Sequence, residues 1–373
     1  MAKATKQQQQ QPAVLRAPAE VQYAAELALL EQADKDPRPA GWRLSPMAAR
    51  SFICGASKPG ISRKFYGDDT LVERAIITLA GNRGLLLVGE PGTAKSMLSE
   101  LLAAAISGSS VNTIQGSAGT TEDQIKYSWN YALLLAEGPS LKALVQAPLY
   151  VGMTQGLMVR FEEITRCPPE IQDTLVSILS DKVMMVPELA DEARVLLAQP
   201  GFNVIATANI RDRGVHEMSS ALKRRFNFET VSPIRDLKME VELVRRECDR
   251  LLKDAAAPVD AQPDAIEVLV TAFHDLREGV TAEGTQVEKP SAVMSTAEAV
   301  SVAFAAGLDA FYYGQRRLSP GIIARHLASA ALKDNADDLK KLRHYFDTVV
   351  QKRSTSDKGG PWAELYKARN EIG

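Results

Sequence analysis

The chain has 373 residues, enough for two or three folded units with a substantial core. Apolar residues make up 45% and charged residues 24%, close to the globular average, which excludes global disorder and a fibrous repeat. The 44 basic and 46 acidic residues leave a formal charge of -2, so general electrostatic attraction to nucleic acid or anionic lipid is not expected.

Cysteine and histidine usage argues against a disulfide framework and a structural zinc site. Cys54, Cys167 and Cys248 stand far apart without C-x-x-C spacing, and the chain has only 4 histidines. The apolar stretches are far shorter than a membrane span, and the amino end is polar where a signal peptide would be apolar. The expected compartment is therefore the cytoplasm, with no membrane partner.

Residues 1–40 predict a flexible N-terminal arm. Ala, Gln, Lys and Pro dominate this segment, which includes five consecutive glutamines from Gln7 to Gln11. So little apolar content cannot order an arm by itself. A short helix that uses Val21, Leu27, Leu29 and Leu30 is an alternative, but it would need a partner surface.

Residues 41–235 predict an α/β domain, because short β-rich apolar runs alternate there with helical patterns. Five buried parallel strands are expected at Leu85 to Val88, Val111 to Ile114, Met158 to Phe161, Val204 to Thr207 and Phe228 to Val231. The long connection from Gln115 to Gly156 indicates an insertion. A β-hairpin is expected from Val183 to Val186 and Arg194 to Leu197.

The pattern after Pro233 is helical throughout. It predicts a helical lid domain over residues 236–353 and a C-terminal tail over residues 354–373. The expected helices are Leu237 to Leu252, Ala265 to Leu276, Thr296 to Ala310, and the stretch from Pro320 to about Val350. Ser319 and Pro320 form a helix start, with serine as N-cap and proline at the first helical position.

A glycine-rich segment between the first strand and a helix predicts a phosphate-binding loop. Its residues are Gly89, Glu90, Pro91, Gly92, Thr93, Ala94, Lys95 and Ser96. Backbone N–H groups and the helix N-terminus would face a phosphate, Lys95 would reach the terminal phosphates, and Ser96 would ligate Mg²⁺. Ala94 replaces the usual glycine, and we expect it to begin the helix in right-handed helical geometry.

Two acids follow the third strand directly. Glu162 is expected to hold Mg²⁺ and Glu163 to polarise the attacking water. Glu162 stands where aspartate is more common, and Arg160 puts a charge into a strand that is usually apolar. The alternative is that both acids merely cap the helix from Pro168 to Leu179.

Three more polar residues are candidates for the same chemistry. Asn209 ends the fourth strand and could orient the attacking water, although an asparagine there could simply end the strand in a turn. Arg224 and Arg225 precede the fifth strand. The pair could be merely solvated, but in a ring of subunits it would point at the neighbour's nucleotide and neutralise transition-state charge.

These motifs, in this order, resemble the AAA+ ATPases, and their details resemble the MoxR branch over roughly Gly67 to Ala336. The branch-like segments are the G-x-P-G-x-A-K-S loop, Ile114-Gln115-Gly116, Ala147-Pro148-Leu149-Tyr150 and Pro169-Glu170-Ile171-Gln172-Asp173. The resemblance implies that the insertion after Gln115 is the helix-2 insert and that Val183 to Leu197 is the pre-sensor hairpin. It also implies that Asn209 is the first sensor and Arg225 the arginine finger.

The resemblance is poorest in the helical domain. MoxR proteins usually carry the second-sensor arginine directly after Ser-Pro, where this chain has Gly321. Arg325, one helical turn later, is the expected substitute in nucleotide binding, with Arg316 and Arg317 as alternatives, although each of the three could equally be a plain surface arginine. Adenine contact is expected from Phe65 and Tyr66, an aromatic pair that could equally be core.

The resemblance implies an ATPase that couples hydrolysis of Mg-ATP at subunit interfaces to remodelling of a partner protein. It further implies a homo-oligomeric ring, expected to be a hexamer, and an adaptor with a von Willebrand factor A (VWA) domain. The two alternatives are a nucleic-acid motor, which the balanced charge disfavours, and a nucleotide-binding scaffold with little turnover.

Overall fold

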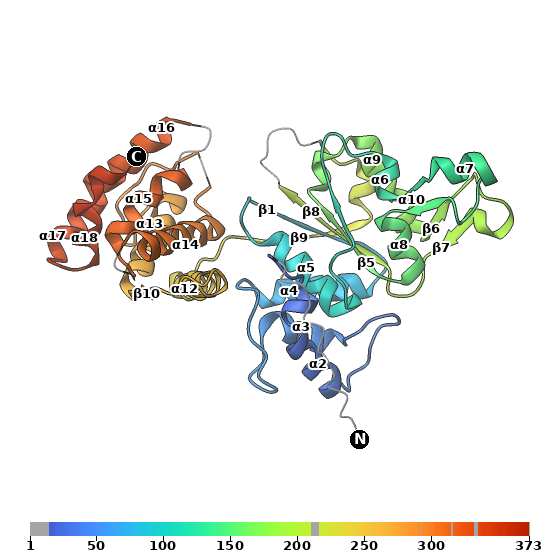
Figure 1. The fold of residues 1–373 in the computed structure, drawn as a ribbon, viewed down its shortest axis with the longest axis horizontal. Coiled ribbons are helices and arrows are strands. Elements are labelled where there is room, and N and C mark those ends of the chain that lie inside the picture. Colours follow the sequence, from blue (N-terminus) through green and yellow to red (C-terminus); the bar gives the residue numbers. More distant parts are fainter. Residues whose placement is uncertain (1–14, 210–215, 292, 315, 332–334, 373) are drawn as a thin grey trace, which may run out of the picture.

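The computed structural model describes residues 15–209, 216–291, 293–314, 316–331 and 335–372 (Figure 1). The central sheet has five parallel strands in the order β2-β5-β8-β1-β9. Their bounds are β1 (Gly84–Gly89), β2 (Thr113–Gln115), β5 (Met158–Glu162), β8 (Asn203–Asn209) and β9 (Phe226–Thr230). The predicted five-stranded parallel sheet is confirmed, except that β2 begins later because Val111 is exposed outside it.

Side chains of β1 alternate between two cores on the opposite faces of the sheet. Leu85 and Leu87 pack with helices α3 (Pro46–Cys54), α4 (Asp69–Ala80) and α5 (Lys95–Ser107), whereas Leu86 and Val88 pack on the other face. Strand β8 lies between β1 and β5, so the carboxyl ends of these three strands meet at one edge of the sheet.

The two predicted insertions both form ordered structure. The first contains α6 (Glu122–Ile125), β3 (Tyr127–Trp129), α7 (Tyr131–Glu137), β4 (Leu144–Gln146) and α8 (Pro148–Gln155), with β3 and β4 antiparallel.

The second insertion is the predicted hairpin. Helices α9 (Pro169–Asp173) and α10 (Leu175–Asp181) lead into it, and its two strands are β6 (Val183–Met185) and β7 (Val195–Leu197). The short helix α11 (Ser220–Lys223) precedes β9. Figure 1 shows α7 and the hairpin together at the end of the molecule away from the helical domain.

The N-terminal segment differs from the flexible arm expected over residues 1–40. Helices α1 (Ala19–Gln22) and α2 (Ala24–Ala33) pack against the sheet domain, and Leu27 and Leu30 are buried in its core. The sheet domain therefore supplies the partner surface that the predicted short helix needs, while Val21 and Leu29 remain exposed. Residues 1–14, including the glutamine run, lie outside the described residues.

The helical domain follows the sheet, as the sequence predicts. It contains α12 (Leu237–Asp254), α13 (Pro263–Glu278), α14 (Thr296–Tyr312), α15 (Pro320–Ala331), α16 (Asp337–Tyr345), α17 (Gln351–Ser356) and α18 (Pro361–Lys367). A two-stranded ladder of β10 (Asp260–Ala261) and β11 (Arg317–Leu318) joins its loops. No helix in the described ranges is long and apolar enough to cross a membrane.

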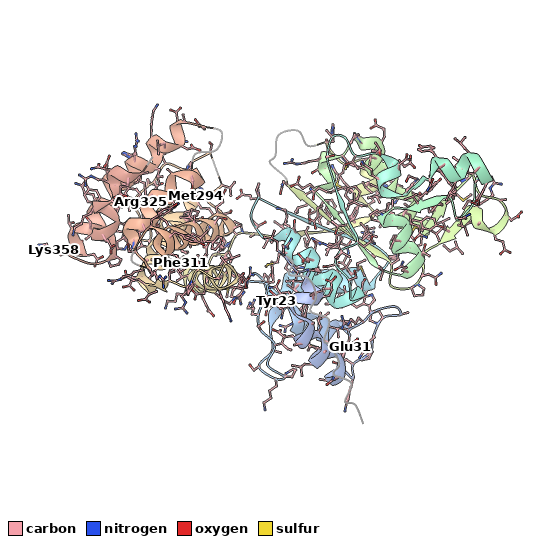
Figure 2. All side chains as sticks on the ribbon, viewed as in Figure 1. Tyr23, Glu31, Met294, Phe311, Arg325 and Lys358 are labelled. Atoms are coloured by element: carbon pink, nitrogen blue, oxygen red, sulfur yellow. The ribbon has the colours of Figure 1, made fainter. Side chains whose placement is uncertain are left out.

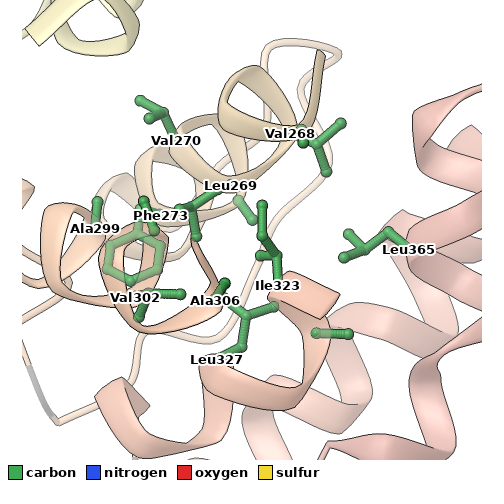
Figure 3. Packing of buried hydrophobic residues seen from close by; sticks show 14 of the residues in the cluster. Val268, Leu269, Val270, Phe273, Ala299, Val302, Ala306, Ile323, Leu327 and Leu365 are labelled. Carbon is green, nitrogen blue, oxygen red and sulfur yellow. The ribbon is translucent and has the colours of Figure 1, made fainter. Parts of the chain in front are cut away.

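The C-terminal segment differs from the separate tail expected over residues 354–373. Leu365 of α18 is fully buried in the helical core together with Ile323 and Leu327 of α15. Figure 3 shows Leu365 beside this cluster. Apolar side chains spaced for burial on one face of a short helix thus join α18 to the domain.

Candidate active site

The predicted phosphate-binding loop connects β1 to α5. The strand ends at Gly89 and the helix begins at Lys95, so the N-terminal N–H groups of a 13-residue helix face the loop. Gly92 has a φ of 77°, and a Cβ atom there would lie 2.3 Å from the Ser295 side chain of the helical domain. Glycine is therefore required both by the turn and by the close approach of the second domain.

Ala94 does not adopt the right-handed helical geometry expected for it. Its φ of 64° and ψ of 25° place it in the left-handed region, as the residue that caps α5. This conformation costs an alanine about 1–2 kcal/mol, whereas glycine adopts it freely. The loop must turn sharply before the helix begins, and this requirement overrides the helical preference of alanine.

Lys95 folds back over the loop. Its Nζ donates to the carbonyl oxygens of Glu90 at 2.7 Å and Gly89 at 3.1 Å, and the residue is 7% exposed. The ammonium group thus lies inside the curve of the loop, within reach of the space that the N–H groups enclose. A bound anion would meet a cation that is already in place.

Glu162 at the end of β5 is buried among four donors. Its Oε2 accepts from the hydroxyls of Ser96 at 2.7 Å and Thr207 at 2.8 Å, and its Oε1 lies 2.6 Å from the Ser99 hydroxyl and 2.8 Å from Arg160. Burial by itself would raise the pKa of the Glu162 carboxyl, but the hydrogen bonds and the guanidinium hold that pKa below its usual value. The carboxylate is ionised, and it contacts the predicted magnesium ligand Ser96 directly.

Glu163 lies beside Glu162 with a different environment. Its backbone has a φ of 55°, its N–H donates to the Thr207 hydroxyl at 2.9 Å, and its side chain pairs with Arg166 at 2.6 Å. Asn209 ends β8 directly opposite Gly89 of β1. Glu163 and Asn209 line the same space above the loop, so the structure brings these two predicted residues together, and Thr207, which was not singled out from the sequence, lies with them.

That space is a cavity of about 510 Å³ between the sheet domain and the helical domain. This volume lies within the range of small-molecule sites. The cavity is lined by parts of the chain that are far apart in sequence: Ala19, Tyr23 and Tyr66, Pro91 to Ser96, Glu163, Thr207 and Asn209, and from the helical domain Arg246, Arg277 and Ser295 to Ala297.

Comparison with known proteins identifies the family. Residues 84–226 match the AAA domain of the dynein-related subfamily, and residues 238–373 match the YehL-like AAA+ ATPase C-terminal domain. The chain is 53% identical over 357 residues to the uncharacterised protein YehL of Escherichia coli K12, covering 96% of this chain and 97% of that protein. The chain belongs to the YehL family of AAA+ ATPases.

More distant relatives share only part of the chain. An uncharacterised protein of Staphylococcus aureus USA300 is 28% identical over 159 residues, covering 43% of this chain and 59% of its own. Among solved structures, Brucella abortus NtrX in complex with ADP has a TM-score of 0.49 at 11% identity, covering 82% of this chain and 68% of NtrX.

Arg224 and Arg225 lie outside the cavity lining in the part of this YehL-family chain that the structure describes. The Arg225 Nε donates to the Ser180 hydroxyl at 2.8 Å, and its NH1 donates to the carbonyl oxygen of Ala221 at 2.9 Å. Arg224 is exposed. A role for either arginine would therefore be exerted on another subunit, as the sequence predicts, and it stays a prediction.

Arg325 does not reach the cavity in this structure, contrary to its predicted contact with nucleotide. It pairs with Glu371, and its NH1 lies 3.5 Å from Asp309, on the surface of the helical domain (Figure 2). The Ser-Pro start does begin α15, but α15 is not the helix that faces the loop. The N-terminal turn of α14, beginning at Ser295, occupies that place.

Several residues that line this YehL-family site were not singled out from the sequence. Arg277 is fixed by Glu240 at 2.7 Å, and Arg246 donates to the Tyr66 hydroxyl at 2.6 Å. Phe65, the other expected adenine contact, is instead 3% exposed in the core. Arg277 could have been found from the sequence, because it is a charged residue on the apolar face of an amphipathic helix.

The N-terminal segment also reaches the site, through Glu100 of α5. The two carboxylate oxygens of Glu100 accept from Arg16 at 2.5 Å and from the backbone N–H of Ala19 at 3.0 Å. Tyr23 lies beside Lys64, whose Nζ is 4.8 Å from the ring centroid. Nothing in the composition of this segment pointed to a role at the cavity.

We expect Arg325→Ala to leave nucleotide affinity unchanged, because its ion-pair partners among the described residues, Glu371 and Asp309, lie on the surface and outside the cavity lining. Arg246→Ala should weaken binding, since it removes the partner of the Tyr66 hydroxyl in the cavity wall. Titration of both variants with a fluorescent ADP analogue checks this pair of expectations. A clear loss of affinity in Arg325→Ala would restore that residue to the site.

Proposed function

We propose that this chain is a MoxR-type AAA+ ATPase that binds Mg-ATP in the cavity above the loop and hydrolyses it. One observation carries the proposal. The phosphate-binding loop, Glu163 and Asn209 come from three neighbouring strands and meet at one edge of the sheet, around a cavity of about 510 Å³. Glu162 lies directly behind this lining, on the hydroxyls of Ser96 and Thr207. The volume and the donors suit a nucleotide.

The loop and Lys95 fit the phosphate groups of ATP. The Nζ of Lys95 has two carbonyl partners on the loop, and these partners can be exchanged for phosphate oxygens without moving the ammonium out of the curve. A charged partner gives the stronger hydrogen bond. Tyr66 and Arg246 stack with 4.9 Å between the guanidinium carbon and the ring centroid, and they form a wall suited to the base or ribose.

Ser96 and Glu162 fit Mg²⁺, because oxygen ligands suit this cation. The Ser96 hydroxyl donates its proton to Glu162, so its lone pairs face away from the carboxylate and remain for a metal. When bound, the cation would neutralise charge on the phosphate oxygens. Ser96 would be its direct ligand, and Glu162 would orient Ser96.

Glu163 and Asn209 are assigned the handling of the attacking water. Of the two acids at the end of β5, Glu163 is the one that lines the cavity, with its side chain about one-third exposed, so its carboxylate can accept a proton there once it leaves Arg166. Asn209 is neutral and can orient the water by donating or accepting hydrogen bonds. Thr207 connects the two acids, since it donates to Glu162 and accepts from the N–H of Glu163.

The proposal is tested first on binding. Lys95→Ala should abolish binding of ATP and ADP, because the loop loses its cation while its backbone remains. Lys126→Ala is the matched control, since Lys126 pairs with Glu122 on the surface of the first insertion. Isothermal titration with both nucleotides is the measurement. If Lys95→Ala binds as tightly as the wild type, the cavity is not a phosphate site of this kind.

The remodelling role and the partner are proposed on the same resemblance. We propose a homo-oligomeric ring, expected to be a hexamer, that acts on a client protein through an adaptor with a VWA domain. Exposed apolar side chains on the two insertions support a docking role; they are Tyr131, Leu135, Leu141, Val145, Met185, Val195 and Leu197. Deleting the β6–β7 hairpin should weaken copurification of such an adaptor in the presence of ATP. Native pull-downs that return DNA instead would favour a nucleic-acid motor.

A further inference from the structure

Two residues of strand β5, Arg160 and Glu162, depart from the common pattern of an acidic strand, and their side chains contact each other. Arg160 and Glu162 are two positions apart, so their side chains lie on the same face of β5, the face that packs on α5. The Arg160 NH2 donates to Glu162 Oε1 at 2.8 Å. Their side chains are 11% and 6% exposed, which makes this a buried ion pair.

The guanidinium of Arg160 uses all three nitrogens. Its Nε donates to the Ser99 hydroxyl at 3.0 Å, its NH1 to the Ser110 carbonyl at 3.0 Å, and its NH2 to the Ser96 carbonyl at 3.1 Å as well as to Glu162. Such a planar fork cannot rotate without losing several bonds together. Arg160 is therefore a rigid connection between β5, α5 and the start of β2.

These contacts divide the Glu162 carboxylate into two halves. Oε1 lies against Arg160 and Ser99, away from the cavity lining. Oε2 lies on the hydroxyls of Ser96 and Thr207, two residues that do line the cavity. Ser96 and Ser99 are three residues apart on α5, so both hydroxyls face the same carboxylate. Because Arg160 and Ser99 hold Oε1, the carboxylate cannot rotate, and Oε2 stays directed at the hydroxyls of Ser96 and Thr207.

We propose that Arg160 is a positioning residue for the metal: by holding Oε1 of Glu162, it keeps Oε2 on the Ser96 hydroxyl and so orients Ser96 toward Mg²⁺. This inference rests on the proposed function. It explains why glutamate stands at 162, because the longer side chain reaches the hydroxyls while its other oxygen stays on Arg160. Partners that orient metal ligands in this way contribute about 10- to 100-fold to metal affinity.

An electrostatic effect of Arg160 and a positioning effect of Arg160 predict opposite changes in magnesium affinity when the residue is replaced. As a cation near the site, Arg160 would oppose Mg²⁺, and its removal would raise magnesium affinity. As a positioning group it promotes Mg²⁺ binding. Arg160→Lys separates the two effects, because lysine keeps the charge but lacks the fork that joins Ser99, Ser110 and Glu162.

The experiment measures the affinity of the protein for a fluorescent ADP analogue, once with Mg²⁺ and once with EDTA. The affinity with Mg²⁺ divided by the affinity with EDTA gives the contribution of magnesium to binding. Arg160→Lys should reduce this ratio about 10-fold, with affinity in EDTA unchanged. Arg74→Lys is the matched control, because Arg74 makes a similar fork to Glu229 at 2.9 and 2.8 Å outside the cavity lining. Its ratio should equal that of the wild type.

A second variant keeps the inference testable if Arg160→Lys fails to fold. Ser99→Ala removes the hydroxyl between the Arg160 Nε and Glu162 Oε1 while both charges remain, and it should also lower the ratio. A ratio that is unchanged or raised in the folded variants overturns the positioning role. Wild-type protein that binds the analogue equally with Mg²⁺ and with EDTA overturns the metal site but leaves nucleotide binding standing. Absence of binding in both conditions overturns the proposed function itself.

Discussion

Glu163→Gln is expected to bind ATP as the wild type does and to lose hydrolysis by about 10²- to 10⁴-fold. Its carboxylate lines the cavity and makes none of the contacts of the phosphate-binding loop, so the amide removes the proton acceptor and little else. Phosphate release under single-turnover conditions, together with ATP titration of the same preparation, is the measurement.

The control for this substitution is Glu122→Gln, an exposed glutamate that pairs with Lys126 in the first insertion. It should hydrolyse ATP at the wild-type rate. Wild-type turnover by Glu163→Gln would move the water-activating role elsewhere, with Glu162 the first candidate. Very low turnover by the wild type itself, with normal binding, would favour a nucleotide-binding scaffold.

Arg225→Ala is expected to reduce hydrolysis by about 10³- to 10⁵-fold, roughly 4–7 kcal/mol of transition-state stabilisation, while ATP binding persists. The physical reason is that a guanidinium supplied by a neighbouring subunit neutralises charge that develops on the phosphates. In this chain the Arg225 side chain is held by Ser180 and Ala221, outside the lining of its own cavity. Hydrolysis per subunit should accordingly rise with protein concentration.

Mixing subunits makes the test specific for action between neighbours. Arg225→Ala retains its own cavity, and Lys95→Ala retains its own arginine, so mixed assemblies should recover part of the turnover that each variant lacks alone. Arg224→Ala serves as the comparison, because that exposed arginine directly precedes Arg225. Failure of mixing to restore any activity would argue against Arg225 and make Arg224 the next candidate.

The sheet and the position of the loop were predictable because both depend on local patterns. Apolar runs such as Leu85 to Val88 become buried strands, and a glycine-rich turn between strand and helix has few alternative structures. The conformation of Ala94 was not predictable from its own preference. Alanine favours helix, but the geometry of the turn places it at a φ of 64°.

Contacts between distant segments explain the other differences. The Ser-Pro signal located the start of α15 correctly, yet which helix faces Gly92 is decided by packing of the whole domain, so Arg325 was misplaced. Arg160 and Glu162 looked like two separate irregularities in the sequence. Only the strand's pleat and the position of α5 show that the two side chains form one pair.

The wall that the helical domain contributes to the cavity determines when, during synthesis, the cavity can be complete. The bond from Ala19 to Glu100 spans 81 positions, and the bond from Arg246 to Arg63 spans 183. Ser295, which touches Gly92, is made after both. A nascent chain can form its sheet core early, since domains fold in order as they emerge. The cavity is nevertheless completed only after the first turn of α14 has left the ribosome, so the sheet domain can fold before the wall beside Gly92 exists.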